Sequence, residues 1–212
     1  MPANASKFTP PRLPGGHVAR PRLTRALDAA CQQPVTWLVG PPGSGKTVLL
    51  AEWAAGRATD GVCWWASLDA GDRRPDLFWA SILRSLSPVG PAVGDAGAPS
   101  PSAEPGRCPP EVARRLAELP SGVVVLDNFD RACTDEVVAA AAHLVEALPR
   151  HVRLVVASRR RHRLDVRQPH RLGAWAELGG RDLAFTCDEA ARLIEALTGR
   201  HVARADVRAL VE

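Results

Sequence analysis

Short apolar runs alternate with amphipathic stretches along most of the chain. Four runs are predominantly apolar, which predicts buried strands at 35–39, 62–68, 123–126 and 152–157. Around them, apolar residues recur at helical spacing and predict helices over 20–30, 48–55, 75–86 and 134–148. Strands that are apolar on both faces and alternate with helices indicate a parallel sheet covered on both sides. The pattern therefore predicts an α/β fold with three layers.

Two stretches rich in proline and glycine interrupt this alternation. Residues 1–19 are expected to be extended or partly disordered. Residues 87–110 hold seven prolines, four glycines and three charged side chains, so they cannot bury enough surface to order themselves and are expected to form a flexible insertion. Near the end, Thr186 and Glu189 match a capping box that opens a helix, and another helix begins near Ala203. Because the chain stops at residue 212 within that helix, we expect a truncated or partial chain.

One motif carries specific chemistry. Residues 40–47 match the phosphate-binding loop pattern G-x-x-x-x-G-K-[ST] at every position, between a predicted strand and a predicted helix. The glycines let successive backbone N–H groups point at phosphates, and the following helix adds its positive end. Lys46 supplies a charge for the β- and γ-phosphates, and Thr47 supplies a hydroxyl ligand for Mg²⁺. The predicted nucleotide-binding residues are Gly40, Pro41, Pro42, Gly43, Ser44, Gly45, Lys46, Thr47 and Val48.

An acid at the end of another apolar strand completes the expected metal site. Asp127 directly follows the 123–126 run and is expected to hold Mg²⁺ through water. The strand at 62–68 leaves room for an extra strand between the loop and Asp127, as in P-loop ATPases of the additional-strand (ASCE) class. No Asn-Lys-x-Asp guanine motif occurs, because the one other lysine, Lys7, follows Ser6. ATP/ADP and Mg²⁺ are therefore the predicted cofactors.

The charge distribution adds one ambiguous feature. Residues 150–171 carry eight arginines and one acid, a local charge of +7, so that the rest of the chain is near −3 out of a formal total of +4. Arg159, at the carboxyl end of a predicted strand, is a candidate for contact with the γ-phosphate, and the alternative is a solvated arginine. The basic run 159–163 is also a candidate for nucleic-acid contact, although no aromatic residues are interleaved with it.

The amino-terminal residues, the lack of long apolar runs and the cysteine spacing all favour a cytoplasmic location. The first residues lack the apolar core of a secretory signal, and no run approaches the ~18 apolar residues of a membrane span. The five cysteines include no CxxC pair and favour reduced thiols. We therefore predict a cytoplasmic protein without a membrane partner.

The ordered set of motifs resembles the nucleotide-binding (NB-ARC/AAA-like) domain of MalT-like, LuxR-type bacterial transcriptional regulators, which belong to the STAND class of signal-transduction ATPases. The resemblance runs from about residue 11 to residue 212. The segments that carry it are 11–13, 18–20 with Leu23, 40–47 with 51–53, 65–69 with Gly71 and Asp72, 125–128, 154–159, and 183–186 with Glu189 and Ala190.

The resemblance implies an ATP-driven switch: an inducer promotes ADP release, ATP binds, the protein self-associates, and a C-terminal helix-turn-helix binds promoter DNA. It places Arg20 near the adenine, Arg159 near the γ-phosphate, Lys46 and Thr47 at phosphate and magnesium, and Asp127 at magnesium. The family often has a second acid after the magnesium aspartate, where this chain has Asn128. An amide cannot accept a proton from the attacking water, so slow hydrolysis is expected, with Asp130 as a candidate substitute.

Together these observations predict a P-loop ATPase domain at 20–180, preceded by the 1–19 segment and followed at 181–212 by the start of a helical lid. The expected function is an ATP-binding switch module, with Lys46, Asp127, Asn128 and Arg159 as the catalytic set. Two alternatives stay open: a small-molecule phosphotransferase whose arginine-rich segment grips phosphate, and a DNA-associated ATPase of the initiator type.

Overall fold

Five parallel strands form the centre of the computed structural model, which describes residues 5–57, 62–87, 107–164 and 175–211. The order across the sheet is β2-β3-β4-β1-β5, and every neighbouring pair is parallel. The strands are β1 (Val35–Val39), β2 (Val62–Ser67), β3 (Gly122–Asp127), β4 (Val152–Ser158) and β5 (Ala176–Leu178). The predicted α/β fold with a parallel sheet is confirmed.

The position of β4 identifies the additional strand. It lies between β1, which leads into the phosphate-binding loop, and β3, which ends at Asp127. β2 instead occupies the edge of the sheet beyond β3. The inserted strand is therefore β4, which ends at Ser158 directly before Arg159, and not β2, which lies between the two motifs in the sequence.

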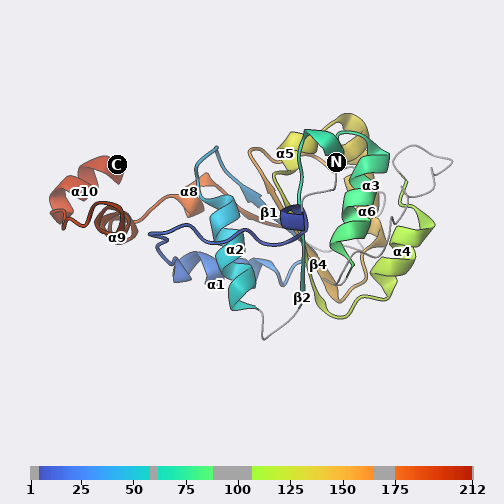
Figure 1. Ribbon diagram of the computed structural model, residues 1–212, viewed down its shortest axis with the longest axis horizontal. Helices are drawn as coiled ribbons and strands as arrows, with labels where there is room; N and C mark the ends of the chain where they lie inside the picture. Colours follow the sequence, from blue (N-terminus) through green and yellow to red (C-terminus); the bar gives the residue numbers. More distant parts are fainter. Residues whose placement is uncertain (1–4, 58–61, 88–106, 165–174, 212) are drawn as a thin grey trace.

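Helices cover both faces of the sheet (Figure 1). α1 and α2 lie on one side, and α3, α4 and α6 lie on the other. The longer helices are α1 (Pro21–Ala30), α2 (Lys46–Gly56), α3 (Pro75–Ser85), α4 (Pro110–Ala117), α6 (Asp135–Ala147), α9 (Cys187–Thr198) and α10 (Arg204–Val211). The short ones are η1 (Ala5–Phe8), η2 (Ala70–Asp72), α5 (Phe129–Ala132) and α8 (Gly180–Leu183). α9 and α10 pack on each other at one end of the molecule.

Alternation along each strand divides the core into two clusters. In β2, Trp64 joins the cluster beneath α3, α4 and α6, whereas its neighbour Trp65 joins the cluster beneath α1 and α2. β3 divides in the same way, with Val124 on the first side and Val125 on the second. Side chains of successive strand residues point to opposite faces, so a strand buried on both faces is apolar at most positions.

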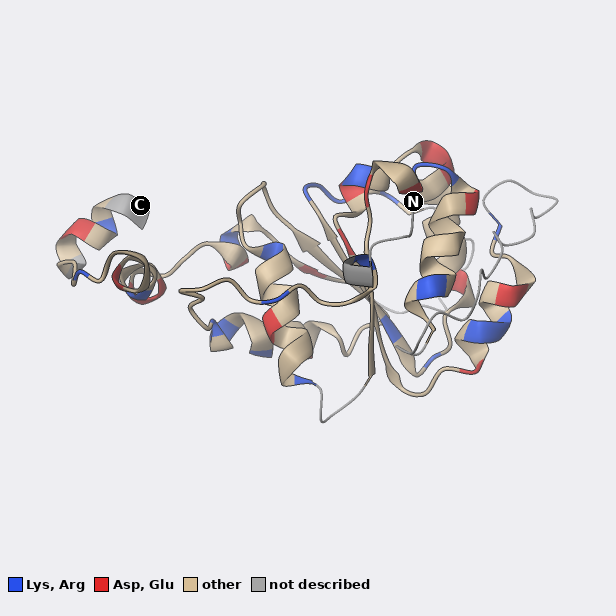
Figure 2. Ribbon diagram, in the orientation of Figure 1, with Lys and Arg blue, Asp and Glu red and all other residues tan. Residues whose placement is uncertain are grey.

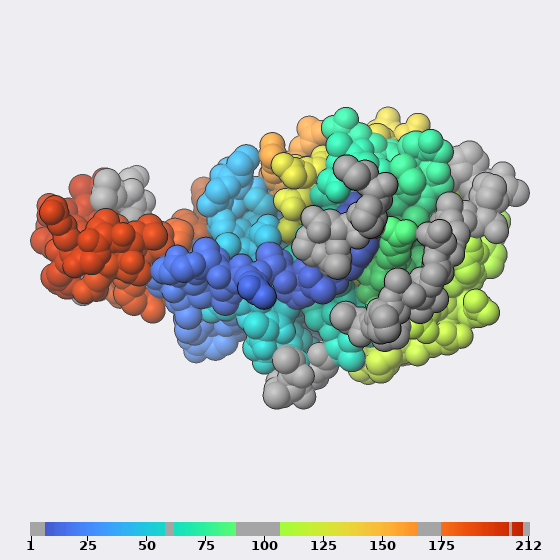
Figure 3. Space-filling model, viewed as in Figure 1, coloured from blue at the N-terminus to red at the C-terminus, as the bar shows by residue number. Residues whose placement is uncertain are grey.

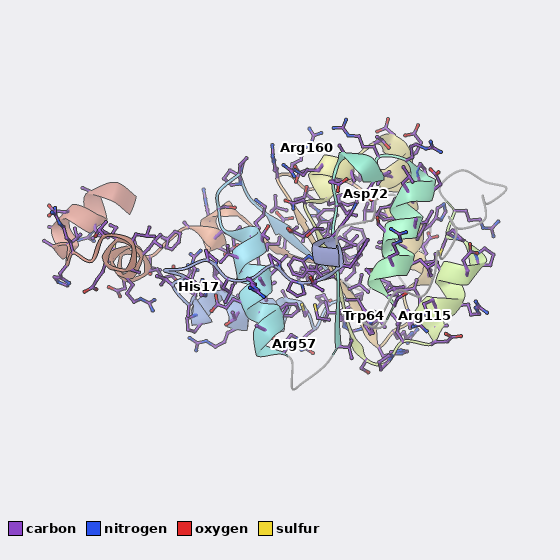
Figure 4. All side chains as sticks on the ribbon, viewed as in Figure 1. His17, Arg57, Trp64, Asp72, Arg115 and Arg160 are labelled. Carbon is purple, nitrogen blue, oxygen red and sulfur yellow. The ribbon has the colours of Figure 1, made fainter. Side chains whose placement is uncertain are left out.

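Part of the amino-terminal segment is more ordered than its composition indicates, whereas residues 9–19 contain no helix or strand. Residues 5–8 form the 3-10 helix η1, and Lys7 Nζ pairs with Asp72 Oδ2 at 2.6 Å and Asp69 Oδ2 at 3.1 Å. The Asp72 carboxylate is buried and also accepts a hydrogen bond from Ser81 at 2.6 Å. From there the segment crosses the face of the molecule towards α9 (Figures 3 and 4). The ion pair is a tertiary contact, so composition alone could not predict this order.

Several short elements were not predicted from the sequence. β5 has only three residues and no apolar run, and it forms because its backbone pairs with β1. α4 begins at Pro110, where the expected flexible insertion ends. Most of that insertion, residues 88–106, lies outside the described residues. Within the described part of the chain, no helix is long and apolar enough to cross a membrane.

The first residue of β3 provides a test of the sheet packing. A Cβ on Gly122 would overlap the Val62 backbone oxygen and lie 2.6 Å from Trp64 Cζ3. Gly122→Ala should therefore lower the free energy of unfolding, measured by urea denaturation, by on the order of 1–3 kcal/mol. Gly56→Ala, at the end of α2, is the matched control, because a Cβ at Gly56 would have no atom within 4 Å. The control should be neutral or mildly stabilising. Equal stability of the two variants would contradict this packing.

Candidate nucleotide-binding site

The turn between β1 and α2 has the geometry of a phosphate-binding loop. Gly43 and Gly45 both have φ of +81°, a conformation that glycine adopts without strain. Lys46 Nζ donates hydrogen bonds within the loop, to Gly40 O at 2.6 Å and Pro41 O at 2.9 Å, and lies 3.2 Å from Ser44 Oγ. The loop curls around its own lysine, with α2 beginning at that residue.

Thr47 and Asp127 meet at the mouth of this loop. Thr47 Oγ1 lies 3.0 Å from Asp127 Oδ1 and 3.1 Å from Oδ2 and donates a hydrogen bond to that carboxylate. Burial raises the pKa of Asp127, and the hydrogen bond from Thr47 opposes that rise. A hydroxyl and a carboxylate from two separate elements thus converge, which is the ligand chemistry that Mg²⁺ accepts.

Asn128 has a backbone conformation suited to its position. Its φ of +57° is the only positive φ of a non-glycine residue within the described ranges, and asparagine tolerates the left-handed region better than most residues. The turn starts α5, and Asn128 Nδ2 donates to Asp127 Oδ2 at 3.0 Å. The amide therefore supports the expected metal carboxylate.

Arg159 forms an ion pair with Asp130. The Arg159 backbone N–H donates to Asp130 Oδ1 at 3.1 Å, and Nε lies 3.0 Å from Oδ2. The Arg159 side chain is 54% exposed and that of Asp130 15% exposed. The pair joins the end of β4 to α5, and it was not predicted from the sequence.

Most of the groups described above line one cavity of about 420 Å³, although Asp127 does not. It is lined by Pro42, Gly43, Gly45, Lys46, Thr47, Val48, Asn128, Asp130, Arg131 and Arg159. Burial lowers the pKa of Lys46, while the charges of Asp130 and Asp127 oppose the decrease. The loop geometry, the lysine, the helix amino terminus and the Thr47–Asp127 pair fit the phosphates and metal ion of Mg-ATP. Gly40, Pro41 and Ser44 contribute around Lys46 instead of lining this cavity.

Arg20 belongs to a separate buried cluster. Its Nη2 donates to Leu183 O at 2.9 Å, Ala184 O at 2.8 Å and Glu189 Oε2 at 2.9 Å, and its guanidinium lies 4.1 Å from the centre of the Phe185 ring. Arg20 does not line the cavity described above. Contact between Arg20 and adenine therefore stays a prediction, and the contacts in the structure link α1 to the chain before α9.

Glu189 is the acid on which this cluster depends. It closes the predicted capping box with Thr186, and it also accepts from Arg22 Nη2 at 3.1 Å. The connection to the phosphate-binding loop is Leu183, whose side chain lies 2.9 Å from the position that a Cβ on Gly40 would occupy. The sequence revealed the capping box, but no local pattern indicated its two arginine partners.

Two curated relatives cover most of the chain. Serine/threonine-protein kinase PknK of Mycobacterium tuberculosis is 29% identical over 217 residues, spanning 99% of this chain and 19% of that protein. The HTH-type transcriptional regulator MalT of Cronobacter sakazakii is 28% identical over 186 residues, spanning 84% of this chain and 20% of that protein. No family model matches the chain. This chain thus spans about a fifth of the length of these relatives.

Solved structures share the fold. Cdc6p from Pyrobaculum aerophilum matches with a TM-score of 0.56 and 17% identity over 95% of this chain and 55% of that chain. The Aeropyrum pernix Orc1 protein, solved in complex with DNA, matches with a TM-score of 0.53 and 18% identity over 88% of this chain and 48% of that chain. The findings together support a P-loop ATPase domain with an α/β fold.

Glu189 provides a pH test of the Arg20 cluster. Burial alone would raise its pKa, but hydrogen bonds from Arg22, Arg20 and the Thr186 backbone outweigh burial and lower the pKa from 4.5 to about 2. A lowered pKa contributes stability that is complete above the unfolded value near 4.5 and is lost as the pH falls towards 2. Glu189→Gln should lower the unfolding free energy on the order of 2–3 kcal/mol at neutral pH.

The difference between wild type and Glu189→Gln, measured by urea denaturation, should narrow as the pH falls from 4.5 to 2. Glu118→Gln is the control, because Glu118 is 55% exposed and its pair with Arg115 has a distance of 3.5 Å. The control should change stability little at any pH. If the difference in unfolding free energy between wild type and Glu189→Gln did not vary with pH, the stabilising contacts of Arg20 and Arg22 would not depend on the charge of Glu189.

Proposed function

We propose that the chain is an ATP-binding switch module of a signal-responsive transcriptional regulator of the LuxR type, which binds Mg-ATP and hydrolyses it slowly. The observation that carries the proposal is the meeting of Thr47 and Asp127 at 3.0 Å beside Lys46, at the mouth of the loop. A strand-terminal carboxylate that faces the hydroxyl of the phosphate-binding loop is the arrangement that P-loop ATPases use.

Each residue of the site has a defined role in this proposal. The backbone N–H groups of the loop and the amino terminus of α2 hold the phosphates, and Lys46 pairs with the β- and γ-phosphate oxygens. Thr47 and Asp127 hold the metal, Asp127 through water. Bound Mg²⁺ supplies neutralisation of the negative charge on the phosphate oxygens. Arg159 stands at the cavity edge, where a guanidinium can pair with the γ-phosphate.

Slow hydrolysis follows from the groups that stand near the expected water. Asn128 occupies the position at which the resembled family often has an acid, and its amide is engaged with Asp127. A positioned general base typically contributes ~100- to 10,000-fold in rate, so an amide in place of that acid makes hydrolysis slow.

Similarity to MalT supports the regulatory role. The HTH-type regulator is matched over 84% of this chain, so the resemblance includes the segments on both sides of the loop. The similarity to PknK does not make this loop a protein-kinase site, because kinases place ATP under a G-x-G-x-x-G loop with the lysine on a later strand. We propose that 20–180 is the ATPase domain, that 181–212 begins a lid, and that inducer binding, self-association and promoter binding involve regions beyond this chain.

The two alternative functions predict other ligands. A phosphotransferase would transfer phosphate from ATP to a small acceptor, and an initiator-type ATPase would bind duplex DNA through basic residues. Figure 2 shows basic and acidic positions interspersed along the described helices on both sides of the sheet. A screen of phosphoryl acceptors and a salt titration against duplex DNA separate these functions from the proposed one.

Replacement of Lys46 tests the site directly. Lys46→Ala should weaken ATP binding, measured by calorimetry, by more than tenfold, because a charge-assisted contact contributes on the order of 1.5–3 kcal/mol. The one other lysine of the chain gives a control: Lys7→Arg keeps the pair with Asp72 and lies outside the set of cavity-lining residues. Equal ATP affinity in wild type and Lys46→Ala would refute the assignment of the site.

Restoring an acid at position 128 tests the explanation of slow turnover. Asn128→Asp should raise the single-turnover rate, because a carboxylate can accept the proton of water and an amide cannot. ATP affinity, measured with saturating Mg²⁺, should change little because Lys46 and the loop are untouched. If ATP binds and the rate is unchanged, position 128 does not limit turnover.

A further inference from the structure

Asp130 stands out among the groups around the cavity. It is the only carboxylate among the described residues that line it. Asp127 does not line the cavity and accepts a hydrogen bond from Thr47, which does. Its place follows from the left-handed turn at Asn128, which ends β3 and starts α5. The turn brings Asp130 back to the carboxyl edge of the sheet, next to the end of β4.

Neither Asp127 nor Asn128 is suited to accept the proton of the attacking water. Asp127 accepts hydrogen bonds from Thr47 at 3.0 Å and from Asn128 Nδ2 at 3.0 Å. Asn128 carries an amide, which has no basic oxygen at neutral pH. Asp130 has one side-chain partner in the structure, the Arg159 guanidinium at 3.0 Å.

The pair between Asp130 and Arg159 is built to be exchanged. The Arg159 side chain is 54% exposed and that of Asp130 15% exposed, so solvent reaches the guanidinium and weakens the net contribution of the pair. Both side chains line the same cavity as Lys46, so an anion in that cavity competes with Asp130 for the guanidinium. A terminal phosphate, with its larger charge and several oxygens, is the stronger partner.

We propose that Asp130 is the general base of ATP hydrolysis in this chain, and that Arg159 is its exchangeable partner. When ATP binds, the guanidinium moves from the carboxylate to the γ-phosphate, which leaves Asp130 free. Water attacks the γ-phosphorus and its proton passes to Asp130. The bond between this phosphorus and the β–γ bridging oxygen breaks, its electron pair leaves with ADP, and Asp130 returns the proton to solvent. The inference rests on the proposed function.

The exchange also distinguishes ATP from ADP. ADP has no γ-phosphate to attract Arg159, so the guanidinium stays with Asp130. Binding of ATP, by contrast, must break the pair. Any change that releases Arg159 in advance should therefore favour ATP alone.

Asp130→Asn, an isosteric change, tests both roles of Asp130: general base of hydrolysis and ionic partner of Arg159. The amide oxygen can still accept from the Arg159 backbone N–H, so the turn is preserved, while the guanidinium loses its anionic partner. ATP affinity by calorimetry should rise about two- to fivefold with ADP affinity unchanged, since a surface ion pair no longer opposes binding. Single-turnover hydrolysis should fall about 100-fold or more. A merely structural role would instead weaken both properties.

Two further variants test the exchange. Arg159→Gln should weaken binding of ATP and not of ADP, and in the double variant Asp130→Asn/Arg159→Gln the gain in ATP affinity should disappear. Asp135→Asn is the charge control, because Asp135 is an exposed acid at the start of α6. It should leave both affinities and the rate unchanged.

The outcomes are distinct. A gain that persists in the double variant, or that extends to ADP, reflects removal of negative charge and overturns the exchange. Hydrolysis at the wild-type rate in Asp130→Asn, or no measurable hydrolysis in wild type, overturns Asp130 as the base. A wild-type chain that does not bind Mg-ATP at all overturns the proposed function, and this inference with it.

Discussion

The parallel pairing of β1, β4 and β3 is the constraint on which the site depends. Parallel strands bring their carboxyl ends to the same edge of a sheet, and ligands of such sheets bind at that edge. Between β1 and β4, Val39 lies opposite Ser158. Between β3 and β4, Val125 lies opposite Val155. The register thereby brings the phosphate-binding loop, Arg159 and Asp127 together, although they are distant in the sequence. The apolar faces that bury the sheet hold this register.

Two arginine–carboxylate clusters illustrate how burial separates structural from exchangeable pairs. Arg20 and Glu189 are 7% and 5% exposed, and the guanidinium has two backbone carbonyl partners besides the acid. Removing one partner would leave an uncompensated buried charge, which is strongly destabilising. The pair therefore stabilises the contact between the start of α1 and the region of α9. Arg159 is mostly exposed and can exchange its partner at small cost. The first cluster ties elements together, whereas the second stands at the cavity where a charged ligand would act.

Sequence reasoning located most of the fold because the signals were local. The apolar strands and the periodic helices followed from side-chain patterning, and the phosphate-binding loop followed from its glycines and lysine. Elements that depend on distant partners were missed or misjudged. β5 forms by pairing with β1, and the order of residues 5–8 depends on Lys7 reaching a carboxylate 65 residues away. The identity of the inserted strand also depended on sheet order, which strand patterns alone do not specify.

The sequence by itself determined the α/β class, the phosphate-binding loop, the strand-terminal Asp127 and the capping box at Thr186, because each is a short-range pattern with its own physical cause. Only the tertiary structure decided which groups meet. It directed the Asn128 amide to Asp127, paired Asp130 with Arg159, and engaged Arg20 with the chain before α9. These contacts join segments that are separate in the sequence or depend on the direction of a turn, so sheet order and side-chain packing had to be known before they could be identified.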